Sequence, residues 1–350
     1  MTRKHDRFLA AFLLSSIFAT PALAAGDQTL LVAEPVHNIG YLPLYIASAK
    51  GFFAKQGLKL KIVTIDSGSG HTNAVLSGQA FAFIGGPEHD AFASAKGMQL
   101  RAVVNVVNRG NVYYEAAKGK DPRPGESMTK YFKGKRIGVN FYGGTPNSIT
   151  RFLLHKWGLD PTKNVTLVET TPAAIFAAMR IGKIDIAVTE EPQITQGIRA
   201  GLWGQPFYNI PKKMGPYAYS TINVRLASIK SHPNTVRKFV LAVMEGLRFT
   251  YDHPKQAALV AKAEFPTMAP GDLTATINRS FEDHLWSKSG LISRRSWATA
   301  QNVVRTAGIL KKHVPYNDII DMRFVKQILA QDKAPTTGVE TQAAQGSSAK

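Results

Sequence analysis

The chain has 350 residues and not one cysteine. This absence excludes disulfides, thiolate nucleophiles and cysteine-ligated zinc together. The sequence also lacks a Gly-x-Ser-x-Gly nucleophile elbow and a His-Glu-x-x-His metal motif. No segment fits a phosphate-binding loop or a dinucleotide fingerprint. We therefore expect a protein with no catalytic residues and no cofactor.

Three histidines give the sequence its one suggestion of a metal site. His37, His71 and His89 each follow a different predicted strand in the first part of the chain. A metal site also needs a carboxylate or a fourth ligand at suitable spacing, and none accompanies them. Helix capping or hydrogen bonding to a ligand is the preferred interpretation, and we expect no metal.

Acidic side chains are scarce, with 24 Asp and Glu against 43 Lys and Arg and a formal charge of +19. Such a charge suggests nucleic acid, an acidic surface or an anionic ligand. The basic residues are scattered, however, and no aromatic RNA-binding signature accompanies them. We therefore expect no nucleic acid as a partner. Two interpretations remain, a solvated basic surface and electrostatic steering of an anionic small molecule.

Long apolar runs are absent except near the start of the chain. Residues 1–7 are rich in Arg and Lys, residues 8–19 are apolar, and Ala22 and Ala24 form an Ala-x-Ala site. This order is typical of a secretory signal peptide, and the apolar run is shorter than the roughly 20 residues of a spanning helix. We predict a cleaved signal peptide over 1–24. Because no cysteine follows the site, we expect a soluble periplasmic protein without a lipid anchor.

Strand and helix patterns alternate in two series. The first covers 29–107 and the second 136–209, and a break rich in Lys, Gly and Pro separates them over 118–133. Alternation of this kind predicts βαβ units and mainly parallel sheets flanked by helices. We therefore predict an α/β fold with two similar halves.

A last strand over 218–224 is followed only by helical patterns. The predicted helices cover 233–251, 255–264, 271–285, 293–309 and 316–329. Because they have no strands of their own, they are expected to pack on the first sheet. The predicted organisation is a discontinuous lobe 1 (28–110 plus 219–330), lobe 2 (111–218), and a disordered tail (331–350). The hinge between the lobes is predicted at the two crossovers, near 105–111 and 217–224.

Ligands of open α/β sheets bind outside the carboxyl ends of the strands, where helix N-termini point. Two Gly/Ser/Thr turns occupy such positions, at 67–70 and 143–145. Their backbone N–H groups and the helix dipoles suit an anionic head group between the lobes. The alternative is that each turn only caps its own helix. Aromatic residues at the same rim either sandwich a planar ligand or pack in the core; they are Tyr41, Tyr113, Tyr114, Phe141, Tyr142, Tyr217 and Tyr219.

Several segments of the chain resemble a known family. They are Gly40–Ala47 with Lys50–Leu58, Leu76–Phe83, and Gly182–Val188 leading to Glu191-Pro192. On these segments the chain resembles the NMT1/THI5-like family of transporter-associated binding proteins for sulfonates, taurine, nitrate and thiamine-pyrimidine precursors. The resemblance implies a type II periplasmic binding protein fold, with two lobes, a hinge and a discontinuous first lobe.

The resemblance also implies a function. The protein would capture a small organic molecule between its lobes and deliver it to the membrane permease of an ABC importer, acting as a monomer and not as an enzyme. The molecule would be a sulfonate- or taurine-like anion or zwitterion, or a pyrimidine-like heterocycle. Two alternatives are a ligand sensor for a receptor and an enzyme similar to a pyrimidine synthase, although that synthase carries a cysteine-rich motif that this chain lacks.

Ligand contacts implied by the resemblance follow the strands, and Tyr142 joins them from the aromatic rim. Glu190 stands where many relatives carry an aromatic residue, and its carboxylate disfavours a simple anion such as nitrate. Glu191 is adjacent on an extended strand and is expected to point to the other face, so the two do not share a proton. The predicted ligand-binding set is Asn38, Tyr41, Ser69, Gly70, His71, Thr72, Gly86, Pro87, Tyr142, Gly144, Thr145, Asn147 and Glu190.

Overall fold

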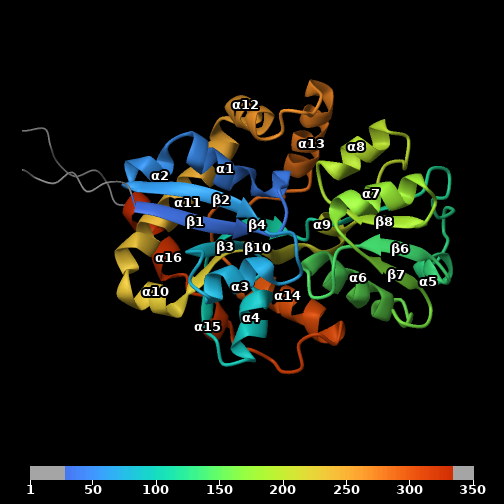
Figure 1. Cartoon of the computed structure of the whole chain (residues 1–350), viewed down its shortest axis with the longest axis horizontal. Helices are drawn as coiled ribbons and strands as arrows, with labels where there is room; N and C mark the ends of the chain where they lie inside the picture. The colour runs from blue at the N-terminus through green and yellow to red at the C-terminus, as the bar shows by residue number, and fades with distance from the viewer. Residues whose placement is uncertain (1–27, 334–350) are drawn as a thin grey trace, which may run out of the picture.

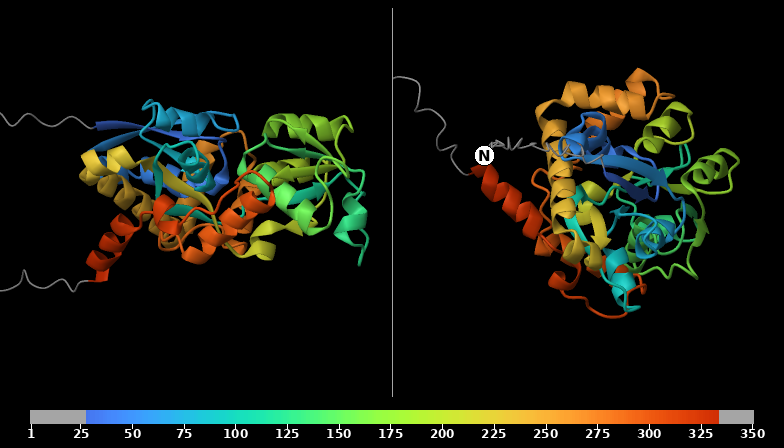
Figure 2. Two further views of the ribbon diagram at one scale, coloured as in Figure 1. Left: turned by 90° about the horizontal axis from the view of Figure 1, so that it is seen from below. Right: turned by 60° about the vertical axis from the view of Figure 1, so that its left-hand side comes forward.

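The computed structural model describes residues 28–333. Two five-stranded sheets form two lobes that lie side by side (Figures 1 and 2). The predicted signal peptide over 1–24 lies outside the described residues, and so does most of the predicted tail. Helix α16 (Arg323–Lys333) extends past residue 330, so the first residues assigned to that tail are helical.

The first sheet has the strand order β2-β1-β3-β10-β4. Its strands are β1 (Gln28–Glu34), β2 (Leu58–Thr64), β3 (Ala82–Gly85), β4 (Leu100–Arg109) and β10 (Pro216–Arg225). Strand β1 pairs in parallel with β2 and β3, whereas β10 runs antiparallel to both β3 and β4. One strand of this sheet is therefore reversed.

The second sheet repeats the arrangement, with the order β7-β6-β8-β5-β9. Its strands are β5 (Tyr113–Ala116), β6 (Arg136–Val139), β7 (Thr166–Glu169), β8 (Ile186–Thr189) and β9 (Tyr208–Asn209). Here β5 is antiparallel to β8 and β9, while β6 is parallel to β7 and β8. In each sheet the reversed strand is the one that arrives from the other lobe. The predicted α/β fold class with two mainly parallel sheets is confirmed.

Helices cover both sheets. The first lobe carries α1 (Leu42–Ala49), α2 (Phe52–Lys55), α3 (Gly70–Leu76), α4 (Glu88–Ser94), α10 (Leu226–Ser231), α11 (Pro233–Asp252), α12 (Pro254–Glu264), α13 (Pro270–Glu282), α14 (Arg294–Thr306), α15 (Tyr316–Ile319) and α16. The second carries α5 (Met128–Phe132), α6 (Thr145–Lys156), α7 (Pro172–Arg180), α8 (Gln193–Arg199) and α9 (Ile210–Met214). No helix within 28–333 is long and apolar enough to cross a membrane.

The predicted helix over 316–329 is wrong as a single element. Ile320 takes an extended conformation (φ −109°, ψ 124°) and separates α15 from α16. It forms a parallel bridge with Ala102 at the free edge of β4, and the amide of Asp321 donates to the Ala102 carbonyl at 2.9 Å. At Ile320 the chain pairs with the edge of β4 instead of continuing the helix. This pairing satisfies backbone N–H and C=O groups of the strand edge that would otherwise be unpaired.

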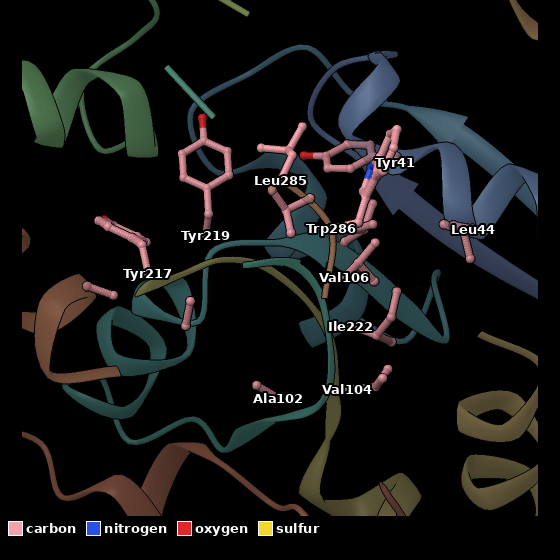
Figure 3. Close-up of a cluster of buried hydrophobic side chains, with 14 of the residues drawn as sticks. Tyr41, Leu44, Ala102, Val104, Val106, Tyr217, Tyr219, Ile222, Leu285 and Trp286 are labelled. Atoms are coloured by element: carbon pink, nitrogen blue, oxygen red, sulfur yellow. The ribbon is translucent and has the colours of Figure 1, made fainter. Parts of the chain in front are cut away.

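The first sheet and the C-terminal segment share one core. Figure 3 shows Val104, Val106 and Ile222 of β4 and β10 gathered with Leu285 and Trp286. The indole of Trp286 donates to the carbonyl of Gly40 at 3.0 Å. This bond fixes the short 3₁₀ turn η1 (Ile39–Tyr41), which follows β1 and leads into α1. The core therefore positions a loop that faces the other lobe.

The chain crosses between the lobes next to two glycines. Gly110 follows β4, and a Cβ at this position would lie 2.7 Å from Ile210 Cγ2. Gly215, with φ of 69°, leads into β10. Most of the predicted hinge over 217–224 is strand β10 itself, so the second crossing occurs earlier than expected, before Pro216.

Candidate ligand-binding cleft

A cavity of about 310 Å³ lies between the two lobes. The loops after β1, β2 and β3 line it from one side, and those after β6, β7 and β8 from the other. Residues of β10 and Phe265 complete the wall. The carboxyl ends of the parallel strands of both sheets thus face one space, as open α/β sheets require of a ligand site. Its size falls within the range of small-molecule pockets.

Glu190 joins the two lobes at this cavity. Its Oε1 accepts a hydrogen bond from the hydroxyl of Tyr219 at 2.5 Å, and its Oε2 accepts one from Asn38 Nδ2 at 2.8 Å. Asn111, at the first crossing, donates to Oε2 at 3.4 Å. Burial raises the pKa of the Glu190 carboxyl to about 7, although the bond from Tyr219 acts in the opposite direction. This acid therefore has neutral partners and no cation.

A second carboxyl bridges the lobes at the opposite helix starts. Glu88, in the first turn of α4, accepts a hydrogen bond from Thr145 Oγ1 of α6 at 2.5 Å. Its other oxygen is buried without a partner among the described residues. Burial raises the pKa of Glu88 to about 7. The lobes also touch at a separate point, where a Cβ on Gly68 would lie 2.9 Å from the carbonyl oxygen of Tyr142. We refer to this arrangement, with the lobes in contact, as closed.

Glu191 has different partners from its neighbour Glu190, and the two carboxyls are not bonded to each other; both residues follow β8, however, and both line the cavity, so the predicted opposite faces of a strand do not apply. The Glu191 carboxylate is 1% exposed and forms an ion pair with Arg279 Nε of α13 at 2.8 Å. Thr276 of α13 and Thr195 of α8 also donate to it, at 3.1 Å and 2.8 Å. Helix α13 lies beside α8 at the junction of the lobes (Figure 1). We call this contact between α13 and lobe 2 the α13 seam.

Two neutral imidazoles form part of the lobe 1 wall. The rings of His71 and His89 have their centroids 4.7 Å apart. Burial lowers the pKa of His89 to about 4, and burial together with the nearby His89 lowers the pKa of His71. His71 Nδ1 is buried without a partner among residues 28–333. His37 lies apart from this pair and bonds to Glu34 at 3.0 Å. In the described part of the chain, no group of three or more His, Asp or Glu residues is arranged to hold a metal ion.

The structure brings seven of the predicted site residues together. All seven line the cavity, four from lobe 1 and three from lobe 2; they are Asn38, Tyr41, His71, Gly86, Gly144, Thr145 and Glu190. They come from five separate loops or helix starts, which supports the placement of the site between the lobes.

The other six predicted residues do not line the cavity. Four belong to lobe 1. Ser69 is exposed and makes no cap hydrogen bond; Ser67 instead accepts from the amide of Gly70 at 2.7 Å. Thr72 is buried and bonds to His89 Nδ1 at 3.3 Å, and Pro87 precedes α4. These residues shape the loops behind the cavity wall.

The remaining two belong to lobe 2. Tyr142 is 53% exposed, and the guanidinium of Arg151 lies 4.9 Å from its ring centroid. Asn147 is buried: its side-chain Nδ2 donates to the backbone carbonyl of Asn140 at 2.9 Å, and its backbone amide donates to Asn140 Oδ1 at 3.0 Å. Asn147 therefore fixes the loop after β6.

Sequence reasoning missed several residues of the wall. Phe141 and Pro172 contribute apolar surface from lobe 2, and Gln193 and Gln196 face the cavity from α8. Of these four residues, only Phe141 was indicated by the sequence, as one of the aromatic residues of the rim. Phe265 follows α12, far along the chain, and no local pattern places it at the cleft.

The fold and the interlobe cavity define a protein with the architecture of the periplasmic binding proteins. Residues 38–257 match the family model described as NMT1/THI5 like, and the chain belongs to that family. A solved protein from Bordetella bronchiseptica superposes with a TM-score of 0.74 at 23% identity, over 88% of this chain and 98% of its own.

Two relatives resemble the chain over most of their length. The putative binding protein YtlA of Bacillus subtilis is 26% identical over 327 residues, which cover 91% of this chain and 96% of YtlA. The riboflavin-binding protein RibY of Chloroflexus aurantiacus is 26% identical over 320 residues, covering 85% of this chain and 86% of RibY.

Proposed function

We propose that this chain is an exported solute-binding protein that captures a small organic molecule between its lobes and delivers it to an ABC importer. The observation that carries the proposal is the cavity, which is built from loops of both lobes and bridged by Glu190. An enclosed space of this kind suits capture, since the ligand becomes part of the interface that holds the lobes together. The names of the relatives YtlA and RibY support it.

Capture would proceed by closure about the two crossings at Gly110 and Gly215. In the open form Glu190 and Glu88 would face water, and their bonds to Asn38 and Thr145 would be broken. A ligand that contacts both lobes favours the closed form by its differential affinity for that form. The closed protein, acting as a monomer, would then dock on the membrane permease. The signal peptide expected over 1–24 would place this cycle in the periplasm.

Closure can be tested through the close approach at Gly68. Substitution Gly68→Val places a side chain against the carbonyl of Tyr142, so full closure should fail. We expect ligand affinity to fall about tenfold, and small-angle scattering should show no compaction on ligand addition. Gly271→Ala is the matched control, because nothing lies within 4 Å of a Cβ there.

The delivery step requires a second measurement. The liganded wild type should stimulate ATP hydrolysis by a reconstituted importer, whereas Gly68→Val should not. Multiple turnover of a bound molecule in place of stoichiometric binding would overturn the proposal, and so would compaction of Gly68→Val equal to that of the wild type.

A further inference from the structure

We propose that His37 is a proton-dependent clamp: as an imidazolium it ties the loop after β1 to the end of α12 and so holds Phe265 in the cavity wall, and as a neutral ring it releases them. The proposal rests on the proposed function, because it concerns the regulation of the same site. Three observations support it, namely the acceptors around the imidazole, the aromatic rings that contact it, and the turn that it holds in place.

Both ring nitrogens of His37 face acceptors. Nδ1 lies 3.0 Å from Glu34 Oε1, whereas Nε2 lies 3.3 Å from the backbone carbonyl oxygen of Glu264 and 3.9 Å from its carboxylate. A neutral imidazole has one N–H group and satisfies only one of these two sides, but the imidazolium donates to both. The geometry therefore suits the protonated ring, and loss of the proton breaks one side of the clamp.

Glu34 is the fixed side of the clamp. It is the last residue of β1, and its side chain is 1% exposed. Its carboxylate also accepts a hydrogen bond from the Tyr45 hydroxyl of α1 at 2.6 Å and from Thr64 Oγ1 at the end of β2 at 2.8 Å. Three elements of lobe 1 thus hold this carboxylate in place. The side that can move is Glu264, which ends α12.

Two aromatic rings contact the imidazole. The ring of Tyr45 stacks on it with centroids 4.8 Å apart, and the centroid of the Phe265 ring lies 4.7 Å away. The faces of aromatic rings attract a cation, so these contacts also favour the protonated form. His37 and Phe265 both line the cavity, and the His37 side chain is 36% exposed. The ring can therefore exchange its proton with water while it contacts a residue of the cavity wall.

The titratable groups around the ring agree with this geometry. The pKa of His37 is raised above 6.5, mainly by its hydrogen bond with Glu34; burial opposes this shift, and the charge of Glu34 and the carbonyl and charge of Glu264 add to it. Burial raises the pKa of Glu264 above 4.5, against the effect of His37. Burial also raises the pKa values of Tyr41 and Tyr45 well above 10, so both stay neutral. The stability that the clamp contributes is therefore present below about pH 6.5 and is lost as pH rises through the pKa of His37 in the folded protein.

The clamped segment is the turn over 265–269, which connects α12 to α13. Within it the amide of Met268 donates to the carbonyl of Phe265 at 3.1 Å, and Met268 is 4% exposed. Lys262 Nζ donates to the carbonyls of Pro266 at 3.1 Å and Met268 at 2.7 Å, so the turn has a second support that does not involve His37. Release of His37 would loosen this turn and free Phe265 from the wall. Ligand exchange should therefore be faster at alkaline than at acidic pH.

The test uses a single thiol in a chain that has no cysteine of its own. Met268→Cys puts this thiol at a buried position of the turn, where iodoacetamide reaches it only when the turn opens. The labelling rate is measured at about pH 6 and about pH 9, and each rate is divided by that of the same variant unfolded in urea, which corrects for the thiolate fraction. We expect the corrected rate to rise at least about threefold between the two pH values. An unchanged corrected rate would overturn the proposal.

Three second substitutions in Met268→Cys assign the rise to the clamp. His37→Gln has no proton to lose between these pH values, so the corrected rate should no longer depend on pH. Glu264→Gln keeps the backbone carbonyl but removes the charge, so the rise should shrink; this variant tests the clamp even where His37→Gln does not fold. Lys262→Met is the matched control, because it removes the other support of the turn. It should speed labelling by a similar factor at both pH values and keep the rise.

Val303→Cys separates local opening from general loss of stability. Val303 is buried in α14, away from the turn, so its labelling reports openings that other groups such as Glu88 cause as pH rises. Its pH dependence should be the same with and without His37→Gln. An equal rise with His37 and with His37→Gln at position 268, or an equal effect of His37→Gln at 268 and 303, shows that there is no clamp at the turn. No ligand is present in this test, so its failure leaves the proposed capture intact, and failure of the wild type to compact on ligand addition would overturn capture without changing the labelling result.

Discussion

The interface between the lobes has two regions, and they differ in whether their acidic side chains are paired with cations. In the α13 seam, Glu191 is paired with Arg279, Asp272 with Arg199 and Asp283 with Lys212. At the cavity, Glu190 has only amide and hydroxyl donors, and so does Glu88, which bonds to the lining residue Thr145 from behind the wall. The seam therefore neutralises its acids within the protein, whereas the cavity does not.

This difference suggests separate roles for the two regions. The seam would hold the lobes together, and the cavity would select the ligand. A buried ion pair is complete in the closed state and needs nothing from outside. A buried carboxyl without a cation is costly, and its cost falls when it gains a proton or a donor from a ligand. In the proposed cycle, the seam would stabilise the closed form whether or not a ligand is present, whereas closure over the cavity would depend on the ligand.

The largest effect is expected from breaking the seam. Arg279→Met removes the cation and leaves Glu191, 1% exposed, without its charge partner. Loss of one member of a buried pair costs about 3 kcal/mol or more, which urea denaturation should show as a lower free energy of unfolding. Arg199→Met is the control, because Arg199 is 60% exposed and its pair with Asp272 should contribute less than about 1 kcal/mol. Equal losses of unfolding free energy in both variants would show that the buried pair of the seam contributes no more than its exposed pair.

A smaller effect is expected from the titration of Glu88, which contacts the cavity-lining residue Thr145. Burial raises the pKa of Glu88 from 4.5 to about 7, so the folded closed form holds a proton that water-exposed Glu88 has released. The stability that Glu88 contributes is therefore fully present below about pH 4.5 and is lost as pH rises through about 7. Between about pH 5.5 and pH 8, the titration of Glu88 should lower the free energy of unfolding by about 1–2 kcal/mol.

Glu88→Gln isolates this contribution. The amide keeps an oxygen for Thr145 but does not titrate, so the variant should lose less stability than the wild type over the same pH range. The comparison is needed because neighbours titrate as well: burial raises the pKa of Asp90, which lies beside Glu88, and lowers that of His89. Tyr217 also faces Glu88 but stays neutral, since burial raises its pKa further. Identical pH profiles in urea would show that Glu88 does not titrate as the closed structure requires.

The sequence predicted the fold well because the relevant signals are local. Apolar alternation in Leu58, Leu60 and Ile62 is visible within β2, and each helix start follows its strand directly. The position of the cleft follows from the same order, since parallel strands present their carboxyl ends on one edge. These features depend on neighbours in sequence, so one chain without relatives suffices to find them.

The sequence could not predict the chemistry of the cleft, which depends on contacts between distant segments. Glu190 was recognised as unusual, but its donors Asn38 and Tyr219 come from elements that precede it and follow it in the chain. Arg279, which neutralises Glu191, lies on α13, in the part of the chain that follows the last strand, so no strand-helix pattern places it at the site. The turn at 67–70 was expected to hold either an anion or a cap, and its own Ser67 proves to be the cap.

The smallest effect is expected at Tyr142, which lies outside both regions and is adjacent in sequence to Phe141 of the cavity wall. Tyr142 is 53% exposed and does not line the cavity, whereas Phe141 does. Tyr142→Ala removes a solvent-exposed contact with Arg151 and should cost about 0.5–1 kcal/mol of stability, with ligand affinity unchanged.

Phe141→Ala is its counterpart within the cavity. This substitution removes part of the lobe 2 wall and should weaken binding of the captured ligand about tenfold, measured by calorimetry beside Tyr142→Ala. Comparable weakening by both would mean that the ligand extends past the wall to the exposed ring. In that case the site predicted from the sequence, which includes Tyr142, would describe the bound ligand better than the cavity does.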